Sequence, residues 1–237
     1  MTVVEIVAQS PRDARVAIGN GADRVELCQA LITGGITASH AVMAGAVDAV
    51  GGDRVAALIR PRAGGYIYDG DEIRVVAADI RNAVALGIGA VVVGALRPDL
   101  SVDANAVERW REAAGDADLV FHRAIDVHPD PVAAVSELVH LGATRILTSG
   151  GATRAGDGTA VLAEMVGAAN GRLQIQAGGG VTIDAIAALR AAGVDAIHLS
   201  ARVAVSDGSP AGPGGGIDEY DVVSDTLVRA ARAAADA

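Results

Sequence analysis

The sequence has no lysine, one cysteine and very few aromatic side chains. All nineteen basic residues are arginine, so the chain cannot form a Schiff base with a carbonyl substrate and lacks the lysine of a P-loop. The single thiol, Cys28, excludes an internal disulfide. Aromatic residues make up 2% of the chain, which leaves no stacking platform for nucleic-acid bases. The net charge of −10 also argues against a nucleic-acid partner.

Long apolar runs and a basic leader are absent as well. No apolar stretch approaches the roughly 18–20 residues of a membrane span, although 51% of the residues are hydrophobic. The first residues, MTVVEIVAQSP, lead directly into a strand-like pattern. We therefore expect a cytoplasmic protein with no membrane partner. A chain of 237 residues fits one domain.

Apolar runs of strand length recur eight times, each followed by helical spacing or by a polar loop. They begin near Val3, Arg24, Val55, Ala90, Leu119, Arg145, Leu173 and Ala196. Glycine precedes the second to the eighth run by a few residues, where helix-ending turns are expected. The pattern predicts an α/β protein, a (β/α)8 TIM barrel of one domain over residues 1–237, with a doubly wound open sheet as the alternative.

Helix starts are marked less uniformly than helix ends. Ser10-Pro11 and Asp130-Pro131 are the clearest pairs of N-cap and proline, and Asp71 and Asp103 are weaker caps. The sequence SDGSPAGPGGG at 206–216 predicts a flexible loop after the eighth strand, and a final helix is expected over 219–235.

Polar residues late in the strands are the candidates for an active site, because barrel enzymes place their sites at the C-terminal ends of the strands. Alternation along the strands puts six of them on the inner face of the barrel: Glu5, Glu26, Arg60, His122, Gln176 and His198. Arg123 is expected to point outward or to belong to the loop. A non-catalytic alternative is that Glu5 and Glu26 pair with Arg60 and Arg62 as a buried polar plug.

Each group of candidates has a role that follows from its chemistry. The candidates for proton transfer are Glu5, Glu26, His122 and Asp126. The candidates for ligand binding are Arg60, Arg62, Ser149, Gly178, Gly179, Gly180, His198, Ser200 and Arg202. The arginines would hold an anion, and the glycines lie after the seventh strand, where barrels often bind phosphate on backbone N–H groups. A metal site built from His122, His198 and a carboxylate has no supporting ligand spacing.

Six stretches carry a family resemblance. They are GADRVELCQALITGGIT (21–37), IRPRAGG (59–65), FHRAID (121–126), LGATRILTSGG (141–151), GGGV (178–181) and AIHLSAR (196–202). In combination they resemble the CutC copper homeostasis protein family. The resemblance implies a (β/α)8 barrel and a cytosolic homo-oligomer linked to copper handling. It also implies Cu(I) binding by thiolates near the barrel mouth, where Cys28 is the thiol present in this chain.

Three positions depart from the family pattern. Val7 stands where the family usually has a cysteine, Gly65 where an aspartate is usual, and Gln176-Ala177 where Met-Pro is usual. Cu(I) normally takes two or more soft ligands. Two hypotheses therefore stand: a CutC-like copper homeostasis protein with Cys28 as metal ligand, and a barrel enzyme that acts on a small phosphate- or carboxylate-bearing metabolite by acid/base chemistry. A non-catalytic scaffold has no sequence feature in its favour, and no cofactor besides copper is expected.

Overall fold

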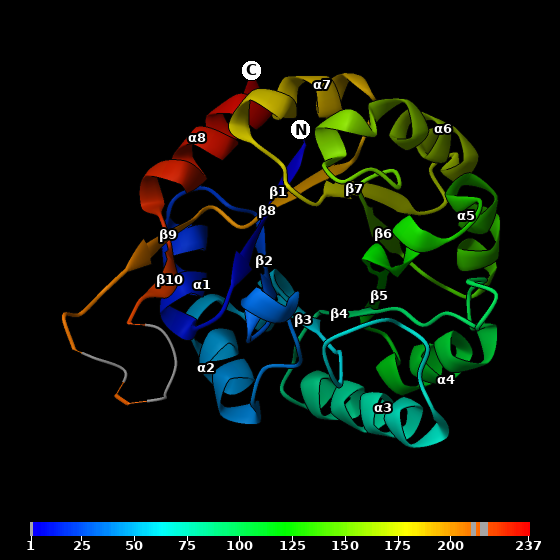
Figure 1. Ribbon diagram of the computed structural model, residues 1–237, viewed down its shortest axis with the longest axis horizontal. Helices are drawn as coiled ribbons and strands as arrows, with labels where there is room; N and C mark the ends of the chain where they lie inside the picture. Colours follow the sequence, from blue (N-terminus) through cyan, green and yellow to red (C-terminus); the bar gives the residue numbers. More distant parts are fainter. Residues whose placement is uncertain (1, 210–211, 214–217) are drawn as a thin grey trace.

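The computed structural model describes residues 2–209, 212–213 and 218–237, and its centre is a closed barrel of eight parallel strands. The strands are β1 (Val3–Ala8), β2 (Arg24–Leu27), β3 (Val55–Leu58), β4 (Ala90–Val93), β5 (Asp118–Phe121), β6 (Arg145–Thr148), β7 (Gln174–Gly178) and β8 (Ala196–Leu199). They pair in sequence order, and β8 closes on β1. Helices form a ring around them (Figure 1). The predicted single-domain (β/α)8 barrel is confirmed, and the open sheet is wrong.

The helices begin largely where the capping residues predict. They are α1 (Pro11–Gly19), α2 (His40–Val50), α3 (Gly70–Ala85), α4 (Ala104–Ala114), α5 (Pro131–His140), α6 (Thr159–Ala169), α7 (Ile186–Ala191) and α8 (Asp225–Asp236). Ser10, Asp103 and Asp130 cap α1, α4 and α5. The cap of α3 is Asp69 rather than Asp71, because the Asp69 side chain accepts the first free N–H groups while Glu72 reaches back to the Asp69 N–H.

Two apolar layers hold the barrel together. The larger layer lies between strands and helices and contains the bulkiest buried side chains, among them Trp110 and Phe121. The smaller layer fills the barrel interior and consists of Val7, Cys28, Ala56, Leu58, Ala90, Val92, Val120 and Leu147. Most of these interior residues come from β3 to β6. The interior surfaces of β7, β8, β1 and β2 instead carry buried polar side chains. The carboxyl groups of the barrel interior therefore lie on β1 and β2, and Arg145 of β6 also reaches Glu5, 4.0 Å away.

The region after β8 differs from the prediction. Strand β9 (Arg202–Val205) pairs antiparallel with β10 (Tyr220–Val223) to form a hairpin beside the barrel (Figure 1). The expected helix over 219–235 is therefore wrong at its start: four residues pair as a strand, and Ser224 then caps α8. Part of the predicted loop, 210–211 and 214–216, lies outside the described residues.

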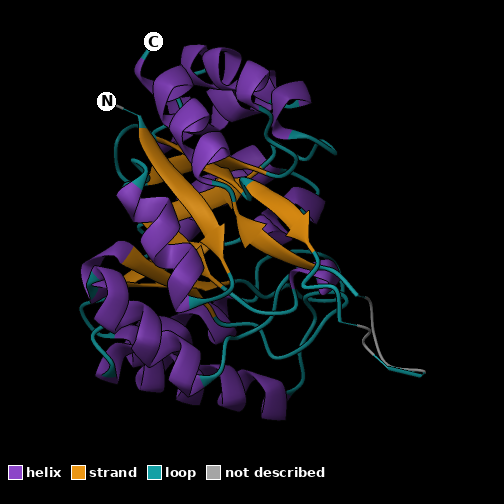
Figure 2. Ribbon diagram, turned by 90° about the vertical axis from the view of Figure 1, so that its left-hand side faces the viewer, coloured by secondary structure: helices purple, strands orange, loops and turns teal. Residues whose placement is uncertain are grey.

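Long loops gather on the right-hand side in Figure 2, where the parallel strands end. Short 3-10 turns shape several of these loops: η1 (Leu31–Thr33), η3 (Arg123–Val127), η4 (Ala155–Asp157) and η5 (Ile183–Ala185). A fifth turn, η2 (Gly52–Arg54), precedes β3. Within the described residues, every helix is too short or too polar to cross a membrane.

Candidate functional site

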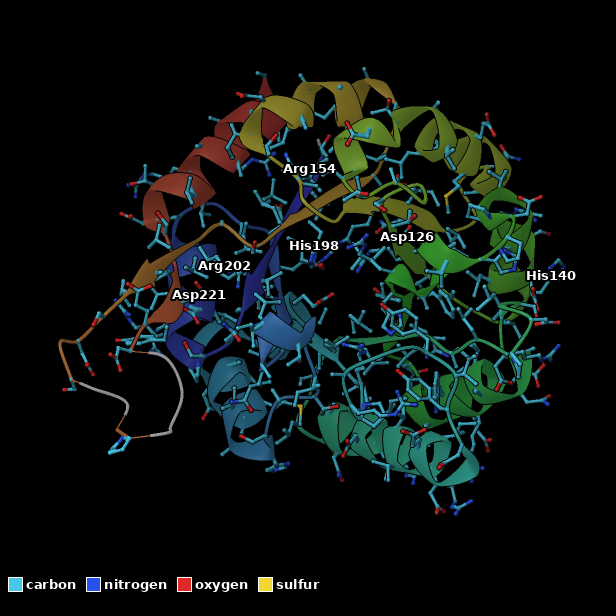
Figure 3. The ribbon with its side chains drawn as sticks, viewed as in Figure 1. Asp126, His140, Arg154, His198, Arg202 and Asp221 are labelled. Carbon is cyan, nitrogen blue, oxygen red and sulfur yellow. The ribbon has the colours of Figure 1, made fainter. Side chains whose placement is uncertain are left out.

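A cavity of about 650 Å³ opens at the C-terminal ends of the strands. It brings together nine of the predicted site residues: Glu26, Cys28, Arg60, His122, Gly179, Gly180, His198, Ser200 and Arg202. Five others lie outside its lining: Glu5, Arg62, Asp126, Ser149 and Gly178. His198 lies inside the ring of helices, whereas His140, on α5, lies at the outer edge of the molecule (Figure 3). The C-terminal ends of the barrel strands thus converge on one pocket.

Glu5 is the centre of a hydrogen-bonded network at the base of this pocket. It is 2% exposed and accepts hydrogen bonds from Arg24 Nε at 2.5 Å, Gln176 Nε2 at 2.5 Å and His198 Nδ1 at 2.8 Å. Burial alone would raise its pKa, but the charges of Arg24, His198 and Arg145 hold the pKa of this carboxyl well below its usual range. The predicted plug of Glu5 with Arg60 and Arg62 is wrong, because Arg24 supplies the charge.

Glu26 lies on the next strand in a different state. Its Oε2 is buried and has no hydrogen-bond partner among the described residues. Burial, and to a lesser degree the negative charge of Glu5, raise the pKa of Glu26 to about 7. Burial opposes the charged form of His198, but Glu26 and Glu5 together raise its pKa above the ordinary value. Two neighbouring carboxyl groups thus differ widely in acidity.

His122 follows β5, opposite this charged side. Its Nδ1 accepts a hydrogen bond from the Ala124 N–H at 3.1 Å, and its Nε2 is buried without a partner in the described part of the chain. Burial and the nearby charge of Arg60 lower its pKa to about 3. The ring packs against Tyr66, with centroids 4.9 Å apart. His122 is therefore a neutral imidazole at physiological pH.

Arg60 is a buried cation held by backbone carbonyl groups. Its guanidinium donates to the carbonyl oxygens of Gly35 at 2.9 Å and Gly64 at 2.5 Å, and to that of Thr33 at 3.3 Å. Among the described residues it forms no ion pair with a carboxylate, and it is 5% exposed. A positive charge at the mouth is thus fixed between the loops after β2 and β3 without being neutralised.

Arg123 is a cavity residue that is not among the predicted site residues. Its Nε donates to Asp126 at 2.7 Å and its Nη2 to Ser149 Oγ at 3.2 Å. A Cβ added to Gly179 would lie 2.6 Å from Arg123 Cζ, so the guanidinium rests directly on this glycine. Of the two alternatives expected for Arg123, the outward orientation is wrong and the place in the loop is confirmed: Arg123 begins the η3 turn and its side chain lines the cavity. Asp126 and Ser149 hold Arg123 in this place.

The glycines after β7 form a tight bend beside Arg123. Gly179 and Gly180 have positive φ of 102° and 60°, and in the described part of the chain their N–H groups donate to no acceptor. Arg154, labelled in Figure 3, packs against Gly180. Gly178 instead leaves room for a neighbouring side chain, because a Cβ at this residue would lie 3.1 Å from the His198 ring. Free N–H groups beside arginines are suited to binding an anion.

Two further predicted arginines have partners outside the cavity. Arg62 pairs with Glu72 at the start of α3 and lies at the surface, so the structure does not bring it to the mouth. Arg202 lines the cavity but pairs with Asp221 across the β9–β10 hairpin at 2.5 Å (Figure 3). Nothing in the sequence marked Arg24 and Asp221 as site residues, because their partners Glu5 and Arg202 lie on other strands.

Cys28 is the thiol that a copper site would need. It is buried in the interior apolar layer, and burial, followed by the charge of Glu26, raises its pKa to about 12. The soft side chains of Met43 and Met165 lie in the outer layer, packed among helix residues. One protonated thiol without a second soft ligand does not fit the coordination that Cu(I) prefers.

Glu5, Glu26 and His198 form, within the described residues, a group whose potential metal-ligand atoms lie within 4.8 Å of one another. His122 is not part of it. Glu5 already bonds Arg24, and a second guanidinium, that of Arg145, lies 4.0 Å away. These positive charges oppose a cation, so the group is better described as a hydrogen-bonded network.

Comparison with known proteins decides the family. A sequence profile described as the CutC family matches residues 2–203. The chain belongs to the CutC family. A CutC family protein from Aliivibrio fischeri is 41% identical over 202 residues, which cover 84% of this chain and 81% of that protein. One from Sinorhizobium medicae is 41% identical over 180 residues, covering 76% and 73%.

Solved structures agree with the CutC assignment. A crystal structure from Streptococcus agalactiae, named as a copper homeostasis protein CutC, has a TM-score of 0.77 and 33% identity, and the match covers 84% of this chain and 98% of that one. Thiamine phosphate pyrophosphorylase from Pyrococcus furiosus has a TM-score of 0.60 at 14% identity, covering 99% and 95%. The latter likeness concerns the fold alone.

Proposed function

We propose that this protein is a barrel enzyme that binds a small phosphate- or carboxylate-bearing metabolite in the cavity and moves a proton to or from it. The observation that carries the proposal is Glu26, a buried carboxyl group with an unpartnered oxygen and a pKa of about 7 in the lining of an arginine-rich pocket. A general base or acid works best when its pKa lies near the working pH.

The anionic end of the ligand has two fixed sources of attraction. Arg60 supplies a buried positive charge without a carboxylate partner, and Arg123 presents its guanidinium beside the free N–H groups of Gly179 and Gly180. Charge-assisted hydrogen bonds of this kind are stronger than neutral ones. Because Asp126 and Ser149 orient Arg123, their proposed role is to position it rather than to touch the ligand.

We assign different roles to the two neighbouring carboxyl groups, Glu5 and Glu26. Glu5 is held ionised by Arg24 and already accepts three hydrogen bonds, so it orients His198 and does not transfer protons. Glu26 has a free oxygen and changes protonation near neutral pH. Environments that push two acids apart in pKa are typical of acid/base sites.

Binding is tested by calorimetric titration with phosphorylated and carboxylated metabolites and with their uncharged analogues. We expect an anionic ligand to bind wild type, and Arg123→Ala to weaken that binding at least ~10-fold because a charged hydrogen bond contributes roughly 1.5–3 kcal/mol. Arg12→Ala removes an exposed arginine on α1 and should leave the affinity unchanged. Equal affinity in all three proteins, or no binding of any anion, would contradict the proposal.

Copper handling is the second candidate, and the family description favours it. Direct Cu(I) binding would depend on Cys28, whose thiol must lose a proton that burial helps to retain. In a chelator-buffered Cu(I) titration we expect wild type and Cys28→Ser to bind alike. Tight binding that the Cys28→Ser variant loses would instead favour the copper role. A cytoplasmic location and homo-oligomerisation remain part of the proposal, and light scattering measures the latter.

A further inference from the structure

Two buried polar atoms in the cavity wall lack a hydrogen-bond partner among the described residues: Glu26 Oε2 and His122 Nε2. Glu26 comes from β2 and His122 follows β5, so the two side chains enter the same cavity from different strands. Leaving a buried polar atom unpaired costs roughly 1–3 kcal/mol. A bound ligand that pairs with both atoms would recover this cost.

The hydrogen bond at the other ring nitrogen fixes what His122 offers. Nδ1 accepts the Ala124 N–H, so Nδ1 carries a lone pair. The neutral ring must then carry its proton on Nε2. The unpartnered atom of His122 is therefore a donor, whereas the unpartnered oxygen of ionised Glu26 is an acceptor.

We propose that the cavity moves a proton at the hydroxyl-bearing carbon next to a carbonyl group, in a phosphorylated α-hydroxy aldehyde or α-hydroxy ketone. The Glu26 carboxylate takes the proton from that carbon, and the C–H electron pair forms the C=C bond of an enediolate. The former C=O π pair moves to oxygen, which accepts a hydrogen bond from His122 Nε2–H. Return of the proton from Glu26 to the neighbouring carbon, with transfer of a hydroxyl proton, gives the isomeric carbonyl compound. No oxidant, reductant or co-reactant is required. This inference rests on the anion binding proposed above.

The surroundings of His122 suit a donor to a developing negative charge. The buried cation Arg60 lies close enough to depress its pKa and would also stabilise an enediolate oxygen. A neutral imidazole can act as such a donor without releasing its proton. The absence of lysine removes the Schiff-base route to the same carbanion.

Gly94 provides a way to test the position of the ring. A Cβ at this residue would lie 2.4 Å from both Cε1 and Nδ1 of His122. The φ of Gly94 is not in the left-handed region, so alanine meets no backbone strain there. Gly94→Ala should therefore displace the imidazole while keeping its chemistry, in contrast to His122→Phe, which keeps a ring and removes the donor.

The experiment compares two probes by calorimetry. Phosphoglycolohydroxamate imitates a phosphorylated enediolate, whereas glycerol 3-phosphate carries the phosphate without a carbonyl oxygen. We expect wild type to bind the hydroxamate at least ~10-fold more tightly. His122→Phe and Gly94→Ala should each reduce that preference to less than about 3-fold, with affinity for glycerol 3-phosphate unchanged. Arg123→Ala should weaken both probes.

The outcomes separate the two proposals. If wild type binds both probes equally, or if the preference for the hydroxamate survives in both His122→Phe and Gly94→Ala, the enolisation chemistry is overturned while anion binding stands. If neither probe binds wild type, this inference fails. Anion binding then depends on the metabolite titrations described above.

Discussion

Glu26 is buried with a free oxygen, so its ionisation should destabilise the folded chain. Its pKa is about 7 in the fold against an ordinary 4.5, and between these values the folded protein holds a proton that the unfolded chain has released. Stability therefore falls as the pH rises through this range. Glu26→Gln removes the titration, and we expect its Tm relative to wild type to rise by roughly 6–12 °C between pH 4.5 and pH 8.

The quantity compared is how the Tm difference between Glu26→Gln and wild type changes with pH. The absolute Tm difference is not used, because the glutamine amide itself alters Tm by an amount that does not depend on pH. Thermal unfolding, monitored by circular dichroism at several pH values, measures the Tm of each protein. Glu108→Gln, at an exposed position on α4, is the control and should track wild type at every pH. A Tm difference for Glu26→Gln that stays constant over the range would mean that Glu26 titrates normally in the fold.

Sequence could predict the inward positions but not the pairing of their side chains. Alternation along β1, β2 and β8 placed Glu5, Glu26 and His198 on the inner face, and all three are buried there. Arg24 was missed because a charged residue at the start of a strand looks like an exposed strand end. Alternation leaves the orientation of Arg123 open between outward-pointing and loop, because the alternating pattern ends at the 3-10 turn that Arg123 begins.

At the level of elements, the start of α3 tests how a helix is anchored near the mouth. Asp69 and Glu72 form a capping box, while Asp71 is exposed and pairs with Arg74 at the surface. Asp69→Ala should lower the free energy of unfolding by about 1 kcal/mol. Asp71→Ala, the matched control, should lower it by less than about 0.5 kcal/mol. Urea unfolding measures the free energy of unfolding of both variants. An equal decrease in the two variants would contradict the assignment of Asp69 as the cap.

Local signals explain which elements could be predicted from sequence. The eight barrel strands were expected within a residue or so of where they begin, because the second to the eighth apolar runs each follow a helix-ending glycine. The β9–β10 hairpin was not expected from the sequence, because Tyr220–Val223 is four residues long and its partner strand lies beyond a loop. Short strands that depend on a distant partner leave little pattern in the sequence.

For the whole molecule, the two apolar layers should contribute unequally to stability. Leu162 on α6 is fully buried in the outer layer, whereas Leu147 on β6 lines the cavity. Leu162→Ala should cost about 2–5 kcal/mol, as a closed cavity in a core does. Leu147→Ala removes the same atoms but opens onto space that water can fill, so we expect roughly half that cost or less. Urea unfolding measures both, and a larger loss for Leu147→Ala would contradict the assignment.

The barrel interior contains both a buried polar network and an apolar layer, and the two would contact different parts of a ligand. Strands β7, β8, β1 and β2 carry the titrating network, while Leu58 and Leu147 on β3 and β6 form part of the opposite wall. A mutation in the apolar wall can alter the size of molecule that fits without disturbing the proton-transfer groups. Under the function proposed above, a lineage built on this barrel can change its substrate one side chain at a time while retaining its chemistry.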